Sequence, residues 1–95
     1  QTRHQMIALV AVQAELRDRL RASNLRADTA HALVDLAVAN PSFTVRRVES
    51  ELGLSYARAN KLVGQLVELE ILKPLDPHAY KRRFYSPSVL AVLMS

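Results

Sequence analysis

Apolar residues recur at three- and four-residue steps along most of the chain, and this spacing predicts helices rather than strands. The first such stretch covers residues 5–23, which contain good helix formers and neither glycine nor proline. Its expected apolar stripe consists of Met6, Leu9, Val12, Leu16 and Leu20. We expect residues 1–25 to be a connector from a preceding domain, a helix that pairs with a second copy, or a helix packed on the rest of the chain, in that order.

A second helix is predicted from Arg26 or Asp28 to Asn40. The carboxylate of Asp28 suits the positive end of a helix dipole, and Pro41 disfavours helical geometry at Asn40. The core positions expected on this helix are Ala30, Leu33, Val34, Ala37 and Val38. The region around Asn24 is expected to be the break between the two helices.

Two further helices are predicted on either side of Gly53-Leu54-Ser55, a join so short that they must meet at a steep angle. Thr44 can cap the first helix, Gly53 can end it in the left-handed conformation, and Ser55 is a good N-cap for the second. The positions expected to be buried are Val45, Val48, Leu52, Leu54, Ala59, Leu62, Val63, Leu66 and Leu69. This pattern is typical of a helix-turn-helix, whose second helix, here residues 55–69, can lie in a DNA major groove.

The segment after this pair predicts a small β-wing. Residues 71–75 and 80–85 are β-prone runs separated by a turn, and a further short strand is expected at residues 43–45. Ser86-Pro87 then predicts the start of a closing helix. The predicted fold class is therefore mainly α with a small β-wing: a winged helix-turn-helix in residues 26–95, preceded by an N-terminal helix.

The charge distribution makes a polyanionic partner plausible. The net charge is +4, and residues 1–27, 28–53 and 54–95 contribute +3, −2 and +3. Hydrophobic residues make up 49% and charged residues 23%, which is the balance of a folded globular domain. No apolar run is long enough to span a bilayer, and there is no signal-peptide pattern and no cysteine, so we expect a cytoplasmic protein with no membrane partner. The chain begins with Gln1 rather than Met, and we expect it to be part of a longer protein.

The candidate DNA contacts are of two kinds. Base readers are expected on the second helix of the pair, where Arg58 can fork onto a guanine and Asn60 or Gln65 onto an adenine. Cations that position the protein on phosphates are expected on both helices and on the wing. The full set of candidates is Ser55, Tyr56, Arg58, Asn60, Lys61, Gln65, Arg46, Arg47, Lys81, Arg82 and Arg83. For the run of residues 81–83, the alternative is a solvated edge strand whose charges block aggregation.

No feature of the sequence predicts an enzyme, a cofactor or a metal. There is no glycine-rich phosphate loop, no cluster of metal ligands, and no nucleophile with a base at useful spacing. We expect His4, His31 and His78 to be surface or packed residues rather than metal ligands. The alternative to DNA binding is a protein-interaction module, for dimerisation or for docking on a catalytic domain of the same protein, and the acidic Glu68 on the reading helix favours it.

The run NPSFTVRRVESELGLSYARANKLVGQLVELEILKP, followed by KRRFYSPSVLAVL, resembles the C-terminal winged helix-turn-helix of bacterial Fic (filamentation-induced-by-cAMP) family proteins. The shared features are the Asn-Pro segment, the Thr-Val start, the Leu-Gly-x-Ser turn and the Ala-Asn pair, and the chain has Phe84-Tyr85-Ser86-Pro87 where the family has an Arg-rich Tyr-x-x-Pro close. The resemblance covers about residues 28–93, and residues 5–23 would match the connector from the Fic catalytic domain.

This resemblance implies an accessory domain that binds double-stranded DNA, with a role in transcription regulation, or that docks on its own N-terminal Fic domain. Adenylyl transfer is expected only of the longer protein, because the His-Pro-Phe…Gly-Asn-Gly-Arg loop is absent from these 95 residues. One residue departs from the family pattern: Glu70 stands where glycine is usual. Either Glu70 keeps a left-handed backbone at a cost of roughly 1–2 kcal/mol, or the preceding helix continues further.

Overall fold

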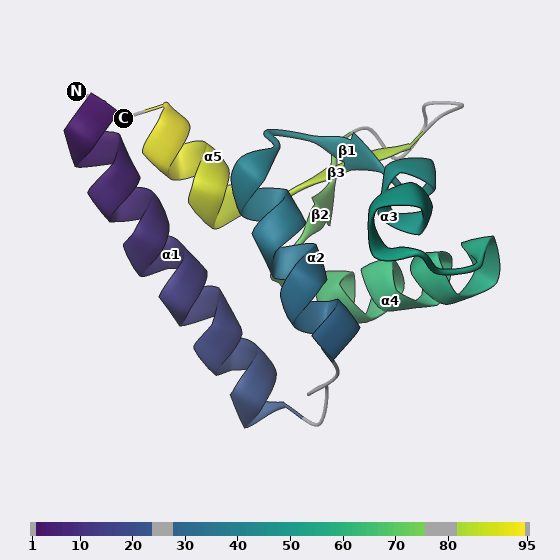
Figure 1. The fold of residues 1–95 in the computed structure, drawn as a ribbon. Coiled ribbons are helices and arrows are strands. Elements are labelled where there is room, and N and C mark those ends of the chain that lie inside the picture. Colours follow the sequence, from purple (N-terminus) through teal and green to yellow (C-terminus); the bar gives the residue numbers. More distant parts are fainter. Residues whose placement is uncertain (1, 24–27, 76–81, 95) are drawn as a thin grey trace.

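A computed structural model of the protein describes residues 2–23, 28–75 and 82–94, with side chains from Met6 onward (Figure 1). Over these residues the chain is mainly helical with a small antiparallel sheet, as the sequence predicts. In chain order the elements are α1 (Thr2–Ala22), α2 (Asp28–Ala39), β1 (Phe43–Thr44), α3 (Val45–Leu52), α4 (Tyr56–Glu68), β2 (Lys73–Pro74), β3 (Arg83–Tyr85) and α5 (Pro87–Leu93).

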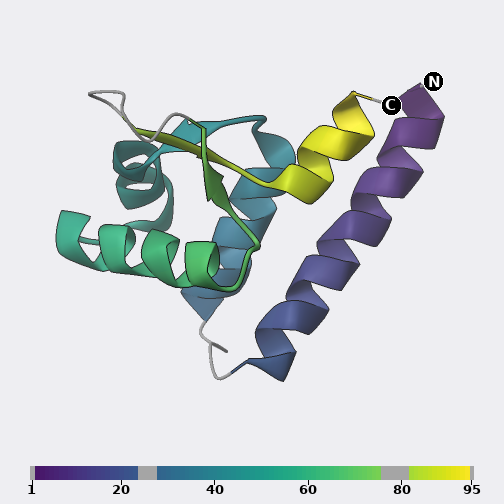
Figure 2. The same cartoon turned by 180° about the vertical axis from the view of Figure 1, so that it is seen from behind.

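The N-terminal helix α1 lies beside α2 and also contacts α5 (Figure 1, Figure 2). Leu16 and Leu20 of α1 are fully buried, and the guanidinium of Arg17 donates to both carboxylate oxygens of Asp35 on α2, at 2.7 and 2.9 Å. The prediction for Met6 was wrong, because its side chain is exposed. With 21 residues α1 is longer than α2 with 12, so α2 does not cover its first turns. No helix in the described part of the chain is long and apolar enough to cross a membrane.

The turn between α3 and α4 has the local geometry that the sequence predicts. The hydroxyl of Thr44 accepts a hydrogen bond from the backbone N–H of Arg47 at 3.2 Å, and the hydroxyl of Ser55 accepts from that of Arg58 at 3.3 Å. Gly53 ends α3 in the left-handed region with φ of 65°, where a side chain would be strained. Leu54 packs against the core. Two caps and one glycine therefore fix where α3 starts and stops and where α4 starts.

Of the two alternatives for Glu70, the structure has the left-handed one. Its φ is 61°, and α4 ends at Glu68 instead of continuing. The backbone N–H of Ile71 donates to the carbonyl of Leu66 at 3.0 Å, which closes the end of α4 and turns the chain toward β2. A non-glycine residue in this conformation carries strain of roughly 1–2 kcal/mol. Ile71 and Leu72, fully buried directly after the turn, hold the backbone in place.

The three strands pair in the order β1-β3-β2, with both pairs antiparallel. Phe43 pairs with Phe84, and Lys73 pairs with Tyr85. The strands are shorter than predicted because Ile71 and Leu72 belong to the turn that leads into β2. The turn of residues 76–79, Lys81 and the break near Asn24 lie outside the described residues.

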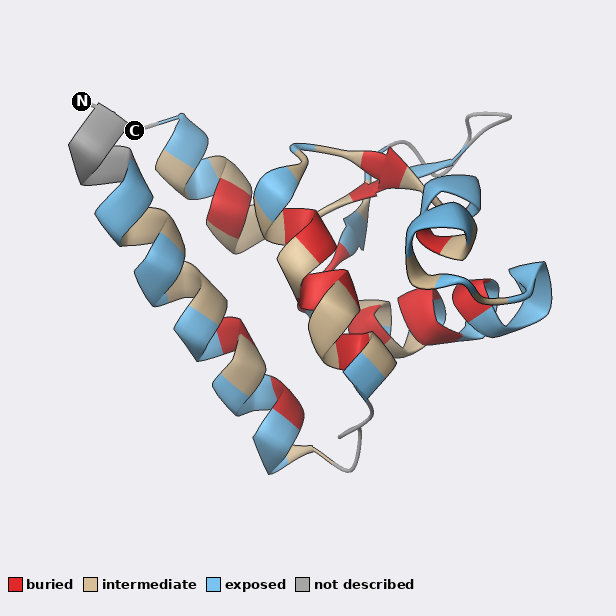
Figure 3. Ribbon diagram, viewed as in Figure 1, coloured by how far each residue is buried: buried red, intermediate tan, exposed pale blue. Residues whose placement is uncertain are grey.

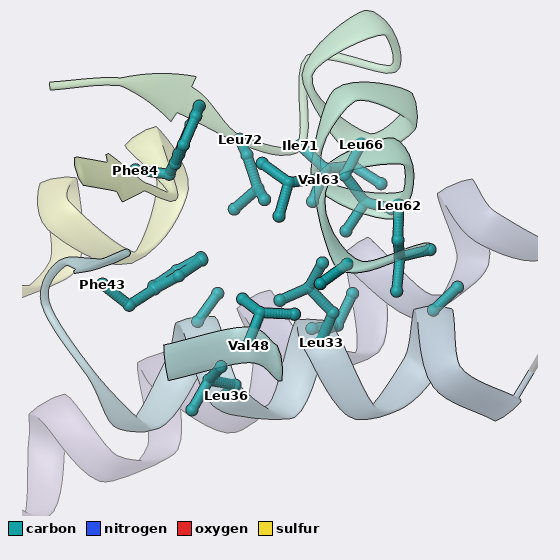
Figure 4. Packing of buried hydrophobic residues seen from close by; sticks show 14 of the residues in the cluster. Leu33, Leu36, Phe43, Val48, Leu62, Val63, Leu66, Ile71, Leu72 and Phe84 are labelled. Carbon is teal, nitrogen blue, oxygen red and sulfur yellow. The ribbon is translucent and has the colours of Figure 1, made fainter. Parts of the chain in front are cut away.

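One hydrophobic cluster joins the helices to the sheet (Figure 4). Phe43 and Phe84 come from the paired strands, and Val48 of α3 lies between them and the helices. The other labelled side chains of this cluster are Leu33, Leu36, Leu62, Val63, Leu66, Ile71 and Leu72. Leu36 is buried although its position was not among those predicted for α2. This single cluster includes residues of α2, α3, α4 and the sheet. The helix α4 therefore packs against the rest of the molecule through one face, and this packing fixes its orientation.

Candidate nucleic-acid interface

The helix α4 buries one face and exposes the other. Ala59, Leu62, Val63 and Leu66 are buried at the three- and four-residue spacing that the sequence predicts. The first turns of α4 lie on the side of the molecule away from α1, and Figure 3 draws much of them in the pale blue of exposed residues. The predicted contacts that are exposed on this helix and at its cap are Ser55, Tyr56, Arg58, Asn60 and Lys61, and Gln65 is half-buried.

Two cations of α4 have no partner among the described residues. The side chains of Arg58 and Lys61 make no hydrogen bond and no ion pair with any residue in this part of the structure. The backbone N–H of Arg58 is used by the cap, because it donates to the hydroxyl of Ser55. Both side chains are therefore available to a ligand without breaking an internal contact.

Arg46 links α3 to the start of α4. Its guanidinium carbon lies 4.8 Å from the centre of the Tyr56 ring, within the range of a cation–π contact. The same guanidinium reaches Glu49 at 3.4 Å, one turn along α3. Tyr56 is exposed, so this contact holds an aromatic ring at the surface where α4 begins.

A surface hollow of about 320 Å³ lies between the N-terminus of α3 and β3. Arg46, Arg47 and Arg83 line it, together with Ser42, Phe43 and Thr44. Arg83 is held by Ser42, whose hydroxyl accepts from Nε at 3.0 Å and whose carbonyl accepts from Nη2 at 3.3 Å. The structure therefore brings three of the predicted phosphate contacts together, although Arg83 is more than 35 positions from Arg46 and Arg47 in the chain. Arg46, which lines this hollow, also contacts Tyr56 at the start of α4.

The remaining predicted cations have different surroundings. Arg47 forms an ion pair with Glu51 at 3.3 Å, so its charge is partly compensated within α3. Arg82 is exposed, with its guanidinium 6.0 Å from the Phe84 ring, at the outer limit of a cation–π contact. Lys81 lies outside the described residues. We use the name basic face for the following residues of α3, α4 and β3: Arg46, Arg47, Tyr56, Arg58, Asn60, Lys61 and Arg83.

Gly64 lies on the exposed side of α4, one turn after Asn60 and Lys61. A Cβ atom built at this position would meet no atom within 4 Å, so packing does not require glycine here. Glycine in a helix interior costs about 0.5–1 kcal/mol relative to alanine. A position that accepts this cost on an exposed face suits close approach of a ligand to the helix backbone.

Two further residues were not predicted from the sequence, Ser42 beside the basic face and Lys73 on the sheet. Ser42 positions Arg83, and no pattern indicates it because the two are 41 positions apart. Lys73 on β2 is exposed and has no ion pair with a described residue. The sequence feature that could have indicated this residue is its position in the β-prone run after α4. Among the described residues, no group of three or more His, Cys, Asp or Glu side chains could hold a metal ion.

No protein-family model, curated protein or solved structure matches this chain. Any assignment of function therefore depends on the basic face and on the order of the elements that carry it.

Proposed function

We propose that residues 28–94 form a winged helix-turn-helix that binds duplex DNA, with α4 in the major groove. The order α2-β1-α3-α4-β2-β3 and the three-stranded sheet support this proposal, because they place a two-helix turn directly before a β-hairpin. The observation that carries it is the pair of exposed cations on α4, Arg58 and Lys61, which have no described partner, on the helix whose Tyr56 contacts Arg46 of the arginine-lined hollow.

The proposed division of roles follows from where each side chain lies. Arg58 and Asn60 project from the exposed face of α4, and an arginine or asparagine there can pair with the edge of a guanine or an adenine. The hollow suits a backbone phosphate, because Arg46, Arg47 and Arg83 converge on it from two elements. A phosphate in the hollow would fix the register of α4 in the groove, since the hollow is joined to α4 through Tyr56.

The resemblance to Fic proteins adds a proposed context. The chain would be the accessory domain of a bacterial Fic-type protein, acting in the cytoplasm, where the chromosome is accessible to it. This assignment predicts a His-Pro-Phe…Gly-Asn-Gly-Arg loop in the coding sequence upstream of residue 1. An upstream reading frame without that loop would remove the Fic context and leave the DNA-binding proposal in place.

The test is a fluorescence anisotropy titration of a labelled mixed-sequence duplex with the 95-residue chain, at salt concentrations between about 50 and 200 mM. We expect binding whose affinity falls steeply with salt, with a slope of about 0.9 in log units for each phosphate contact. Selection from a random duplex pool then gives the preferred site. An absence of binding at the lowest salt concentration would contradict the proposal.

The second candidate function is a protein-interaction module. A specific observation favours it: large apolar side chains are exposed on α1 (Met6, Ile7 and Val10) and at the end of α5 (Leu93 and Met94). In Figure 1, α1 lies on the other side of the molecule from the first turns of α4. Because α1 lies away from the first turns of α4, a protein partner bound at α1 and DNA bound at the basic face do not exclude each other.

A further inference from the structure

The hollow between the N-terminus of α3 and β3 differs in charge from two other hollows on the surface. A hollow of about 480 Å³ is lined in part by the carboxylates of Asp35 and Glu51, and one of about 280 Å³ by that of Asp18. The hollow beside β3, of about 320 Å³, has no Asp or Glu among the described residues that line it, and three of these residues are arginines. Of the three hollows, it is the one that suits an anion.

The three arginines of the hollow keep N–H groups available for a ligand. A guanidinium has five N–H donors. Arg83 uses Nε and Nη2 on Ser42. Arg46 and Arg47 each direct one nitrogen at a glutamate of α3, at 3.4 and 3.3 Å. In the described part of the chain these guanidinium groups make no further hydrogen bond or ion pair, so each has donors left for the oxygens of an anion.

Contacts within the protein hold the hollow in shape. The hydroxyl of Ser42 accepts from Nε of Arg83 at 3.0 Å, and its carbonyl accepts from Nη2 at 3.3 Å. Arg83 pairs with Thr44 in the register of β1 and β3, and Phe43 beside it is buried. A site whose side chains are already held loses less freedom when a ligand binds. The hydroxyl of Thr44 accepts from the backbone N–H of Arg47, so the site depends on the arginine side chains and not on the end of α3.

The charge and the size of the hollow favour a phosphate group. Arginine N–H groups match the oxygens of phosphate in paired, charge-assisted hydrogen bonds. Two of the three arginines share their charge with Glu49 and Glu51, in partly exposed pairs that hold weakly. A phosphate monoester, with about two negative charges at pH 7, gains more from these cations than a carboxylate with one. A volume of about 320 Å³ is at the small end for ligand pockets, which favours inorganic phosphate or a small phosphate monoester over a nucleotide.

We infer that the hollow binds a free phosphate group, as inorganic phosphate or as the terminal phosphate of a small molecule, and that this anion competes with duplex DNA. The binding of the anion does not depend on DNA binding. The competition rests on the proposed function, because Arg46, Arg47 and Arg83 are the side chains proposed to contact a backbone phosphate. Free phosphate would then weaken DNA binding by more than its ionic strength accounts for.

The first test is an NMR titration of the ¹⁵N-labelled 95-residue chain with sodium phosphate, without DNA, with sodium chloride adjusted to hold the ionic strength constant. We expect saturable shifts of the backbone amides of residues 42–47 and 83, with a dissociation constant on the order of 1 mM. Glycerol phosphate is the second titrant: tighter binding than inorganic phosphate identifies an organic monoester as the ligand, and equal or weaker binding identifies the inorganic ion. For either titrant, shifts that do not saturate by about 20 mM, or that are as large at the arginines of α1, would overturn the inference.

Matched variants assign the binding to the hollow. Arg83→Gln should weaken phosphate binding by about tenfold, whereas Arg82→Gln removes the same charge from the neighbouring exposed position outside the hollow and should change it by less than about twofold. Ser42→Ala keeps all three arginines but releases Arg83, and it should weaken binding by about three- to fivefold, with Ser42→Thr restoring it. Thermal unfolding without phosphate checks that each variant folds. Equal losses in the Arg82 and Arg83 variants would overturn the assignment, because net charge alone would then explain the binding.

The second test measures competition with DNA. The affinity for a labelled duplex is determined by anisotropy at constant ionic strength, while chloride is replaced by phosphate up to about 10 mM. Phosphate should weaken binding by about threefold relative to chloride in the wild type, and the Arg83→Gln variant should not distinguish the two salts. Equal affinities of the wild type in both salts would overturn the competition. A chain that binds no duplex in either salt would contradict the proposed function and the competition together, whereas the NMR titration decides the phosphate site by itself.

Discussion

The arginines of α1 and the cations of α4 and β3 are chemically alike but have different surroundings. On α1, Arg17, Arg19 and Arg21 each form an ion pair with a carboxylate, at 2.7, 3.5 and 2.6 Å. On α4, on β3 and directly before β3, the exposed Arg58, Lys61, Arg83 and Arg82 have no ion pair with a described residue. The two ends of the chain carry equal net charge in the sequence, yet among the arginines and lysines whose side chains the structure describes, only those of the second end can bind an external anion without competition from a carboxylate.

This difference shows why net charge alone does not locate a binding surface. Exposed ion pairs contribute little to stability, about 0–1 kcal/mol each, but they place a carboxylate where a phosphate would otherwise bind. The helix α3 is intermediate, because Arg46 and Arg47 are paired with glutamates and also line the hollow. The contrast between the paired cations of α1 and the unpaired cations of α4 leads to four predictions.

The largest expected effect is on DNA binding when two cations of α4 are removed together. The double variant Arg58→Ala/Lys61→Ala should weaken binding by about a hundredfold and reduce the salt slope by about 0.9, because one base contact and one phosphate contact are lost and only the phosphate contact adds to the slope. The matched variant Arg19→Ala/Arg21→Ala removes the same charge from α1 and should change affinity by less than about twofold. Anisotropy titrations compare the two. Equal losses would mean that only net charge matters.

The second prediction separates base reading from phosphate binding. Arg58→Ala should cost about 1–3 kcal/mol on the preferred site and relax base preference at one position. Arg82→Ala should weaken binding to all sequences alike and flatten the salt slope by about 0.9. Selection from a random duplex pool with each variant measures the preference. An unchanged preference in the Arg58 variant would assign that side chain to phosphate instead.

The third prediction concerns Gly64. Gly64→Ala should raise the free energy of unfolding by about 0.5–1 kcal/mol, because alanine is the better helix former and its methyl group enters open space. The same variant should bind duplex less tightly if the helix backbone approaches the DNA here. Thermal unfolding and anisotropy give the two readings. A variant that is more stable and binds as well as the wild type would show that the helix backbone does not approach the DNA closely at this position.

The smallest expected effect comes from freeing a paired arginine. Glu51→Gln releases Arg47 beside the hollow and should tighten DNA binding by about two- to fivefold at low salt. Glu15→Gln releases Arg19 on α1 and changes the net charge equally, but it should leave the affinity unchanged. Titrations of both variants at one salt concentration decide the point. An equal gain in the two would show that the paired and unpaired regions do not differ in function.

The local parts of the fold were predictable because their causes lie within a few residues. Thr44, Gly53 and Ser55 have the residue types that caps and a left-handed turn require, and the structure confirms all three. The conformation of Glu70 was left open between two alternatives, because sequence alone does not weigh its strain against the burial of Ile71 and Leu72 that fixes the turn.

The parts that depend on distant contacts were not predictable. Nothing in the pattern around Met6 indicates that α2 ends too soon to cover it. The exposed face of α4 was foreseen from helical spacing, but the hollow was not, because it needs Ser42 to hold Arg83 from 41 positions away. The roles assigned to residues 1–25 and to the base readers stay predictions.

The most direct test of the central claim is an NMR map of duplex binding over the whole chain. Backbone amide shifts of the ¹⁵N-labelled protein are followed as its selected duplex is added, at about 100 mM salt. We predict shifts concentrated at residues 55–65, at 44–47 and at 82–83, with the paired arginines of α1 unchanged. Shifts centred on α1, or none at saturating duplex, would contradict the assignment of DNA binding to α4 and the hollow beside it.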